Sequence, residues 1–334
     1  PAEGKQELSV CEKGSRLMIQ GEGFEIEFDR VRGFISGYQV GADKLIEKGY
    51  PLNLWRAPVD NDRNTERLWR DEMVYTVQNI VQRVEIEEKD GVVLICCYQV
   101  CAPISKDWKI AYQTLYTIEK NGVVTIELNG VPTGKLPECL PRIGLRFGLD
   151  NACQQLCWYG RGVEETYADC KEGNPFGVHR RTVEENYFPY VTPQENGNHT
   201  DVRWTSLTDN DGNGILVAAD GTVESSALHV KAENINPVSW TDYPYNNQTI
   251  RHSTEVPMDE QTYLCLDAIQ RGVSNTGFFN HIPLEGFYPT TKQNADGSYN
   301  TYAERFRIVP VTSDTDKMEE SKAGFEASSV AGEL

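Results

Sequence analysis

Apolar and polar residues alternate with a period of two along most of this chain. In the segment FEIEFDR the apolar positions are Phe24, Ile26 and Phe28, and residues 142–149 and 304–311 repeat the same alternation. Because successive side chains of a strand point to opposite faces, a period of two predicts a strand with one buried face. The chain is therefore expected to be built largely from strands.

Longer apolar runs and the scarcity of helical patterns extend this expectation to the whole chain. Residues 91–100, 109–118 and 122–131 are apolar or aromatic runs that follow one another at the spacing of a strand and a turn. The best helical pattern is short, at 65–73, with a Thr or Asn as its expected cap. These patterns predict an all-β fold, a large antiparallel sandwich in one domain. The acidic segment 312–334 is expected to be a tail or a peripheral helix.

Charge and hydropathy exclude two classes of partner. The 334 residues include 50 acidic and 32 basic side chains, giving a net charge of −18, and no dense Lys/Arg stripe occurs. Such a surface repels the phosphate backbone of a nucleic acid. No apolar run approaches the roughly 18 residues that a membrane helix needs. The chain begins without Met and without a signal peptide, so we expect it to be a piece cut from a longer polypeptide.

The nine cysteines are predicted to be free and mostly buried. Their number is odd, and they lack the paired C-x2-C spacing of a zinc site. Several lie in strand-like runs, where Cys acts as a small apolar residue. Unpaired cysteines also favour the cytoplasm over the periplasm, although a piece of a chain does not carry its parent's signal peptide.

Four stretches contain more polar and aromatic residues than strand packing requires. The first carries Asp60 and Asp62, and the second carries Glu164 and Glu165, which alternation would place on opposite faces of a strand. Glycoside hydrolysis needs two carboxylates facing each other across a sugar. The alternative for the Asp-Asn-Asp run is a turn whose side chains accept backbone N–H bonds. The four stretches are residues 53–69, 157–171, 187–204 and 263–279.

Metal sites and nucleophile motifs are not indicated. The oxygen-bearing side chains at 60–64 miss the spacing of a Ca²⁺ loop. The five histidines are scattered without a zinc-binding arrangement, and no G-x-S-x-G motif occurs.

The motifs NLWRAPVDNDR, WYGRGVEETYADCK, YVTPQENGNHTDVRW and TYLCLDAIQRGV occur in this order along the chain. Together they resemble the C-terminal domain, also called the small chain or fifth domain, of family 2 glycoside hydrolases that are β-galactosidases. The resemblance runs from Leu8 to Pro310. It implies a galactose mutarotase-like β-supersandwich at 13–311, preceded by a linker at 1–12.

The resemblance also implies where the chemistry of the parent enzyme lies. Retaining hydrolysis of terminal β-D-galactosides is carried out by two Glu residues in an α/β barrel whose motifs do not occur in this sequence. The Mg²⁺ and Na⁺ ions of the family are held mainly by that barrel. We therefore expect this chain to be inactive alone, with no catalytic residue, cofactor or metal of its own. Its expected partners are the missing barrel and sandwich domains, a galactoside bound by the parent, and further copies of the chain in a homo-oligomer.

Two rim segments and a set of structural residues follow from the same resemblance. A mobile loop after the Asp-Asn-Asp run maps onto Arg63, Asn64, Thr65 and Glu66. A second loop contributes part of the sugar platform and maps onto Ser274, Asn275, Thr276, Gly277 and Phe278. Thr276 or Gly277 falls at the platform position, where Phe278 or Phe279 could substitute by stacking on a sugar. The signature residues expected to be structural are Arg56, Asp60, Asn61, Asp62, Trp158, Gly160, Glu165, Tyr167, Glu195, Asn196 and Arg203.

The polar stretch 187–204 is interpreted as a long ordered loop that enters a strand. Asn196 and Gly197 are expected to form a turn with positive φ, and the Asn198 side chain to bond to backbone. Glu195 and Arg203 are predicted to be hydrogen-bonded to neighbouring segments such as 158–169.

Two other functions remain open from the sequence. A stand-alone sugar-binding module would expose aromatic residues such as Trp158, Tyr159, Trp204 or Trp240. An aldose 1-epimerase would need a His acid and a carboxylate base near one ring oxygen. The candidate residues for that pair are His179, His199 or His229 with Glu195 or Glu255.

Overall fold

Two antiparallel sheets make up most of the structure, a computed structural model that describes residues 7–235, 252–274 and 285–325. The smaller sheet has five strands in sequence order and the larger sheet has twelve. The strands of the smaller sheet are β1 (Ser9–Lys13), β2 (Arg16–Gly21), β3 (Phe24–Asp29), β4 (Phe34–Val40) and β5 (Asp43–Ile46). The strands of the larger sheet are β6 (Lys48–Gly49), β7 (Gln78–Lys89), β8 (Val92–Ala102), β9 (Trp108–Ile118), β10 (Val124–Gly134), β11 (Arg142–Asp150), β12 (Gln155–Arg161), β13 (Phe176–Thr182), β14 (Asn198–Thr208), β15 (Gly214–Leu228), β16 (Gln261–Gln270) and β17 (Tyr302–Val311).

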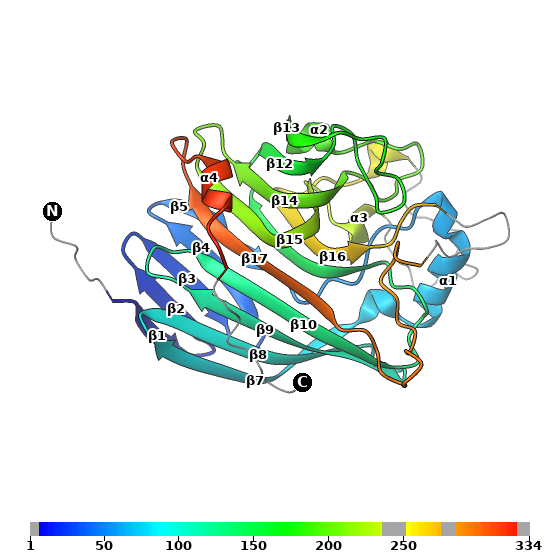
Figure 1. Ribbon diagram of the computed structural model, residues 1–334, viewed down its shortest axis with the longest axis horizontal. Helices are drawn as coiled ribbons and strands as arrows, with labels where there is room; N and C mark the ends of the chain where they lie inside the picture. The colour runs from blue at the N-terminus through cyan, green and yellow to red at the C-terminus, as the bar shows by residue number, and fades with distance from the viewer. Residues whose placement is uncertain (1–6, 236–251, 275–284, 326–334) are drawn as a thin grey trace.

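The larger sheet is strongly curled, with the smaller sheet at the left and α1 at the right in Figure 1. Its main path runs β13-β12-β14-β15-β17-β10-β9-β8-β7, and β16 joins β15 to β11, which pairs with β6. All pairs among the described strands are antiparallel. The predicted all-β antiparallel fold is confirmed.

Helices are few and short. The α-helices are α1 (Arg63–Asp71), α2 (Val183–Asn186), α3 (Ala232–Ile235) and α4 (Lys317–Ser321), and the 3-10 turns are η1 (Asp60–Asp62), η2 (Val74–Thr76) and η3 (Ser253–Glu255). The helix predicted at 65–73 is present as α1 but begins two residues earlier. Its N-cap is Asp62, not the expected Thr or Asn, and the Asp62 side chain makes no capping hydrogen bond because it is engaged with arginines. Among the described residues no helix is long and apolar enough to cross a membrane.

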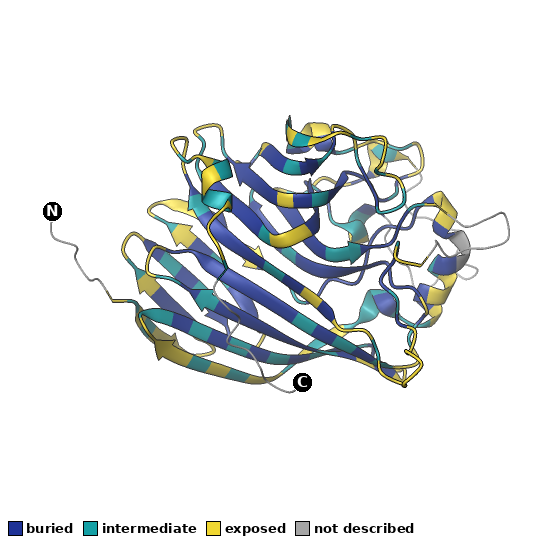
Figure 2. Ribbon diagram, viewed as in Figure 1, coloured by how far each residue is buried: buried dark blue, intermediate teal, exposed yellow. Residues whose placement is uncertain are grey.

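A single main core lies between the two sheets. It contains Leu17 and Phe28 from the smaller sheet together with Ile95, Trp158 and Phe306 from the larger one. Figure 2 shows buried residues along the central strands and exposed ones at the hairpin ends and along the edge strand β7. The alternation read from the sequence corresponds to this burial, since every second residue of β8 is buried.

The structure adds one element at each end of the predicted domain. Residues 9–12, expected in a linker, belong to β1 because Leu8 and Val10 pack against the main core. Within 312–334 the structure places α4, whose Met318 packs on a smaller apolar cluster around Trp204 on the outer face. The peripheral helix is therefore the correct alternative for residues 317–321.

All nine cysteines lie in the described residues and are free thiols. The prediction of buried thiols is correct for most of them but wrong for Cys11 and Cys170, which are exposed. Neither of these two lies on the inner face of a strand, so the sequence argument from strand-like runs does not apply to them.

Candidate functional site

One carboxylate, that of Asp62, lies between two arginines at the end of the fold that carries α1. Asp62 Oδ2 is 2.6 Å from Arg56 Nη2, and Asp62 Oδ1 forms an ion pair with Arg271 Nη1. All three side chains are fully buried. Asp62 also accepts the backbone N–H of Val59 at 2.9 Å, so the Asp-Asn-Asp run is a turn of the predicted kind. We call Arg56, Asp62 and Arg271 the arginine triad.

The triad joins the first sequence motif to the fourth. Arg56 Nη1 donates to the carbonyl oxygen of Arg271 and, at 3.3 Å, to Gln270 Oε1. Burial opposes the charge of Arg56, but the carboxylates of Asp62 and Glu195 together outweigh burial, and the pKa of Arg56 is raised. At Arg271 burial is the larger effect and lowers the pKa. Two buried cations therefore depend on one carboxylate.

A second carboxylate, that of Asp169, holds the chain just beyond the triad. Asp169 Oδ1 accepts the N–H of Val273 at 3.0 Å, and Asp169 Oδ2 accepts the N–H of Ser274 at 2.8 Å. Asn61 Nδ2 donates to the Val273 carbonyl at 2.9 Å. Asp169 lies inside the second sequence motif, but sequence reasoning did not select it. The available signal was a short carboxylate after a turn, a residue type that often accepts backbone N–H bonds.

Gly272 connects this part of the chain to the residues that follow 275–284. Its N–H donates to the Phe287 carbonyl at 2.7 Å, so the chain on either side of 275–284 is joined by a backbone hydrogen bond. A Cβ at Gly272 would overlap the carboxylate of Asp169, which explains why glycine fits here. We call Asp169, Asn61 and the 272–274 backbone the clamp.

Glu165 organises the loop that begins at 187. Its carboxylate accepts the N–H of Gly197 at 2.8 Å, the Tyr167 hydroxyl at 3.3 Å and the Tyr190 hydroxyl. Gly197 has a φ of 72°, as expected for the turn with Asn196. The prediction of an ordered loop is confirmed for this part of the stretch.

Two asparagines complete the loop. Asn198 Nδ2 donates to the Thr166 carbonyl and to Glu224 Oε2, both at 2.9 Å, and Asn196 Oδ1 accepts the N–H of Phe188 at 3.0 Å. Burial raises the pKa of Glu224 to about 7. The predicted role of Asn198 as a partner of backbone is confirmed.

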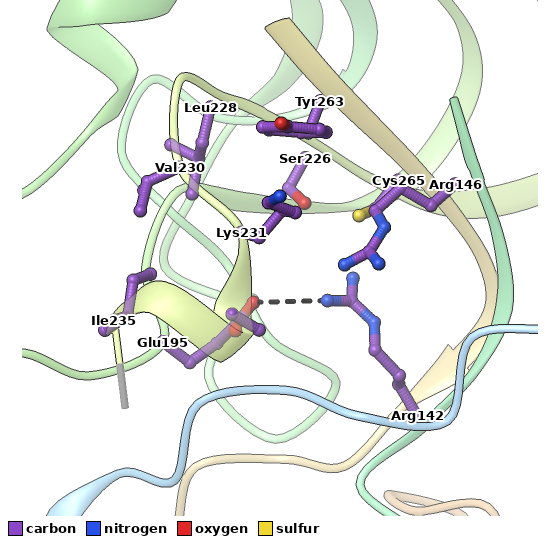
Figure 3. A pocket seen from close by; sticks show the side chains of 11 residues that line it. Arg142, Arg146, Glu195, Ser226, Leu228, Val230, Lys231, Ile235, Tyr263 and Cys265 are labelled. Carbon is purple, nitrogen blue, oxygen red and sulfur yellow. Dashed lines mark ion pairs between the residues drawn. The ribbon is translucent and has the colours of Figure 1, made fainter. Parts of the chain in front are cut away.

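Glu195 points inward from this loop toward β11, as Figure 3 shows. Its Oε1 is 3.8 Å from Arg142 Nη1, and Arg142 pairs on its other side with Asp267. Burial raises the pKa of Glu195, partly offset by Arg142 and Arg56. The expectation for Glu195 was a hydrogen bond to a neighbouring segment such as 158–169. Among the described residues its partner is instead Arg142 of β11, a strand whose position in the sheet the sequence does not indicate.

A cleft with a volume of about 320 Å³ opens where these segments meet. The first motif supplies one wall, Glu165 and the loop at 190–195 supply another, and Val273 of the clamp lies beside them. Asp60 is exposed there, and its N–H donates to Gln194 Oε1 at 3.3 Å. The described residues that line the cleft are Val59, Asp60, Asn61, Glu165, Tyr167, Cys170, Tyr190, Gln194, Glu195 and Val273.

Comparison with known proteins identifies this arrangement of motifs. The family model for the β-galactosidase small chain matches residues 20–298. The chain belongs to the β-galactosidase small-chain family. A β-galactosidase from Priestia megaterium is 31% identical over 271 residues, covering 80% of this chain and 24% of the relative. A β-galactosidase from Actinobacillus pleuropneumoniae is 25% identical over 274 residues, covering 81% of this chain and 25% of the relative.

This small chain spans about a quarter of the length of the curated relatives it matches. Among solved structures it is similar to a galactose mutarotase related enzyme from Lactobacillus acidophilus, at 9% identity with a TM-score of 0.39. That match covers 91% of this chain and 97% of the other. It is also similar to the galactosidase domain of an α-galactosidase-sucrose kinase, at 10% identity with a TM-score of 0.40, covering 91% of this chain and 42% of that one.

The first predicted rim segment lies in α1, and only one residue of the second lies among the described residues. Residues 63–66, predicted as a mobile loop, form the first turn of α1, where Thr65 is buried and Glu66 pairs with Arg70 Nε at 2.8 Å. Ser274 is exposed and bonded to Asp169. The other predicted rim positions, Asn275, Thr276, Gly277, Phe278 and the alternative Phe279, lie outside the described residues.

Arg203 differs from its predicted role. It is exposed, and its guanidinium lies over the rings of Tyr159 and Phe176, 5.9 and 5.3 Å from their centroids. The register of β14 against β15 shifts on both sides of Val202, which turns Arg203 outward. The contact with Tyr159 does lie in the expected segment, but it is a cation–π contact and no hydrogen bond of Arg203 is found among the described residues.

Two further signature residues, Trp158 and Gly160, are closely packed within the larger sheet. Trp158 is fully buried, donates to the Arg161 carbonyl at 2.8 Å and stacks on His199 with ring centroids 3.8 Å apart. Gly160 lies so close to β14 that a Cβ would press on the backbone of Val202. Trp204 is buried as well, Tyr159 is half-buried, and Trp240 lies outside the described residues. Two of the four aromatics considered for a sugar-binding face, Trp158 and Trp204, are thus buried.

The histidine and glutamate pairs required for an epimerase do not assemble around Glu195. His199 Nε2 lies 2.9 Å from Asn186 Oδ1, and burial lowers the pKa of His199 to about 3. His229 contacts Gln154 and the Gln261 carbonyl, while His179 contacts the Pro175 carbonyl. Glu255 accepts the backbone N–H of His252 within η3. In the part of the chain that the structure describes, no group of three His, Cys, Asp or Glu side chains could hold a metal ion.

Proposed function

We propose that this small chain is the C-terminal domain of a retaining β-galactosidase that hydrolyses terminal β-D-galactosides. The two catalytic Glu residues, and the Mg²⁺ and Na⁺ ions, belong to a barrel elsewhere in the same polypeptide. This chain supplies the rim of that active site through residues 63–66 and 274–278 and helps to assemble the subunits of the parent.

The convergence of four motif segments around one cleft supports this proposal most strongly. The arginine triad fixes the chain at the start of α1, and the clamp fixes the chain at Ser274, the first residue of the second rim segment. Substrate-positioning groups must be held rigidly, because small misplacements lower rates steeply. Buried ion pairs and backbone hydrogen bonds at the base of both segments meet that requirement.

The carboxylates of this cleft are poorly suited to hydrolysis by themselves. A retaining mechanism needs one carboxylate as nucleophile and one as proton donor on either side of the scissile bond. Glu165 is occupied by three hydrogen-bond donors, and Glu195 is paired with Arg142. Reaction chemistry is therefore assigned to the parent's other domains.

A chromogenic β-galactoside tests the proposal. The 334-residue chain alone should release no chromophore, whereas the longer polypeptide that contains it should hydrolyse the substrate and give a product with retained anomeric configuration, followed by NMR. Hydrolysis by the chain alone, or a longer polypeptide that is inactive on β-galactosides, would contradict it.

A further inference from the structure

The cleft beside the clamp has the size and chemistry of a binding site in its own right. Its volume of about 320 Å³ lies at the lower end of the range of roughly 300–1,000 Å³ found for small-molecule sites. Its described lining mixes two apolar side chains with carboxylates, amides and tyrosines, and includes no Lys, Arg or His. This mixture offers apolar contact together with several hydrogen-bonding groups.

Within the described residues, Glu195 is held by one ion pair and by no hydrogen bond. It is only 5% exposed, yet its carboxylate accepts no hydrogen bond from the described residues, and its ion pair with Arg142 spans 3.8 Å. An ionised carboxylate can accept about four hydrogen bonds. A buried carboxylate without donors is costly, so an occupant that supplies donors is favoured.

Two arginines act on the charge of the Glu195 carboxylate. Arg142 and Arg56 both favour its ionised form. On the side of Arg142 the carboxylate also lines an inner cavity of about 20 Å³, which has room for a single water molecule (Figure 3). The same residue also lines the open cleft. A ligand that donates hydrogen bonds to the Glu195 carboxylate is therefore favoured over a ligand that adds another positive charge.

The two tyrosines beside Glu195 have fixed positions. The hydroxyls of Tyr167 and Tyr190 both donate to Glu165, which holds the phenol groups at the cleft wall. Fixed aromatic groups next to carboxylates and amides suit a ligand that combines hydroxyl groups with an apolar ring face. A pyranose ring has this combination.

We propose that this cleft binds a neutral saccharide unit, one of whose hydroxyl groups donates to Glu195. The need for a neutral hydroxyl donor follows from the cleft itself, and the choice of a saccharide rests on the proposed function. The described lining residues all belong to this chain, so binding is measured on the chain alone.

Cys170 provides a local probe, because it lines the cleft and is exposed. The substitution Cys11→Ser in the 334-residue chain removes the other exposed thiol. The rate at which a disulfide reagent labels Cys170 is then measured at increasing concentrations of methyl β-D-galactoside. If the sugar excludes the reagent, labelling should slow saturably, roughly tenfold at a sugar concentration ten times Kd. Glu195→Gln should weaken protection roughly ten- to a hundredfold, as expected for losing a hydrogen bond to a charged group.

Controls separate binding from folding. Glu184→Gln, at an exposed carboxylate outside the cleft lining, should leave protection unchanged. If Glu195→Gln fails to fold, Cys170→Trp fills the mouth of the cleft from an exposed position and should abolish the heat of sugar binding in calorimetry.

Labelling that is unaffected by sugar at high millimolar concentration would overturn the proposal. Protection by acetyl-arginine amide but not by the sugar would also overturn it, because the cleft would then receive a basic side chain from a neighbouring domain. The hydrolysis assay of the longer polypeptide is independent of both outcomes, so failure of this proposal is distinguishable from failure of the proposed function.

Discussion

Asp62 and Asp60 stand two residues apart in the same motif but have opposite surroundings. Asp62 is fully buried between Arg56 and Arg271, whereas Asp60 is exposed at the cleft. Asp62→Asn should lower the free energy of unfolding by roughly 3–5 kcal/mol, because it leaves two buried cations without their carboxylate. Urea unfolding measures the change. Asp60→Asn is the matched control and should stay within about 0.5 kcal/mol; equal effects of the two substitutions would rule out the triad as an anchor.

Glu304 is a buried carboxylate with no hydrogen-bond partner for either oxygen among the described residues. Burial raises its pKa well above the usual range, so the folded protein retains a proton that the unfolded chain loses above roughly pH 4.3. Stability therefore falls as pH rises from there toward the folded-state pKa. The neutral substitution Glu304→Gln should remove this pH dependence. The free energy of unfolding of the variant minus that of the unsubstituted chain should therefore increase by roughly 1–3 kcal/mol between pH 5.5 and 7.5.

Urea unfolding at both pH values checks this expectation. Glu88→Gln, at an exposed position of β7, provides the control and should show no comparable change between the two pH values. A Glu304→Gln difference that stays constant with pH would mean that Glu304 is ionised in the folded protein.

At the scale of single residues, the sequence identified the members of the site better than their partners. Asp62, Glu165 and Asn198 could be selected from motifs, because short polar side chains near turns commonly accept or donate backbone hydrogen bonds. Arg142 as the partner of Glu195 could not be predicted, since it depends on which strands are neighbours in the sheet. Asp169 stood in a quoted motif, but only the tertiary structure brings it to Val273.

Strand β11 illustrates a constraint that acts on a whole element. Its register against β16 shifts next to Gly144, where an added Cβ would overlap the Leu266 carbonyl and the Asp267 carboxylate. Gly144→Ala should cost roughly 1–3 kcal/mol in the free energy of unfolding, because the two strands must separate locally. Gly173→Ala is the matched control, since a Cβ there meets nothing within 4 Å. Comparable thermal unfolding midpoints for the two variants would contradict the close packing of β11 on β16.

Elements with strong alternation were predictable, and those shaped by tertiary contacts were not. The burial of β3 and β8 follows the period of two that the sequence displays. The start of α1 was misplaced, because the residue at its N-cap is committed to the arginine triad instead of to the helix. Residues 9–12 looked like a linker because β1 is short and exposed along most of its length.

For the whole molecule, the fold class followed from composition and period, but the strand order did not. The order of the larger sheet places β17 between β15 and β10, and joins β11 to the rest through β16. Such pairings depend on loop geometry and long-range packing, for which local patterns carry little information. The cleft depends on the same long-range order, since its walls come from segments more distant in sequence than any local pattern spans.

The backbone hydrogen bond between Gly272 and Phe287 has a practical consequence for protein engineering. Together with the hydrogen bonds of Asp169 to Val273 and Ser274, it holds the chain on both sides of residues 275–284. A library of alternative ten-residue inserts can therefore be grafted between these two sides without redesigning the scaffold. Under the proposed function, such inserts would vary the second rim segment.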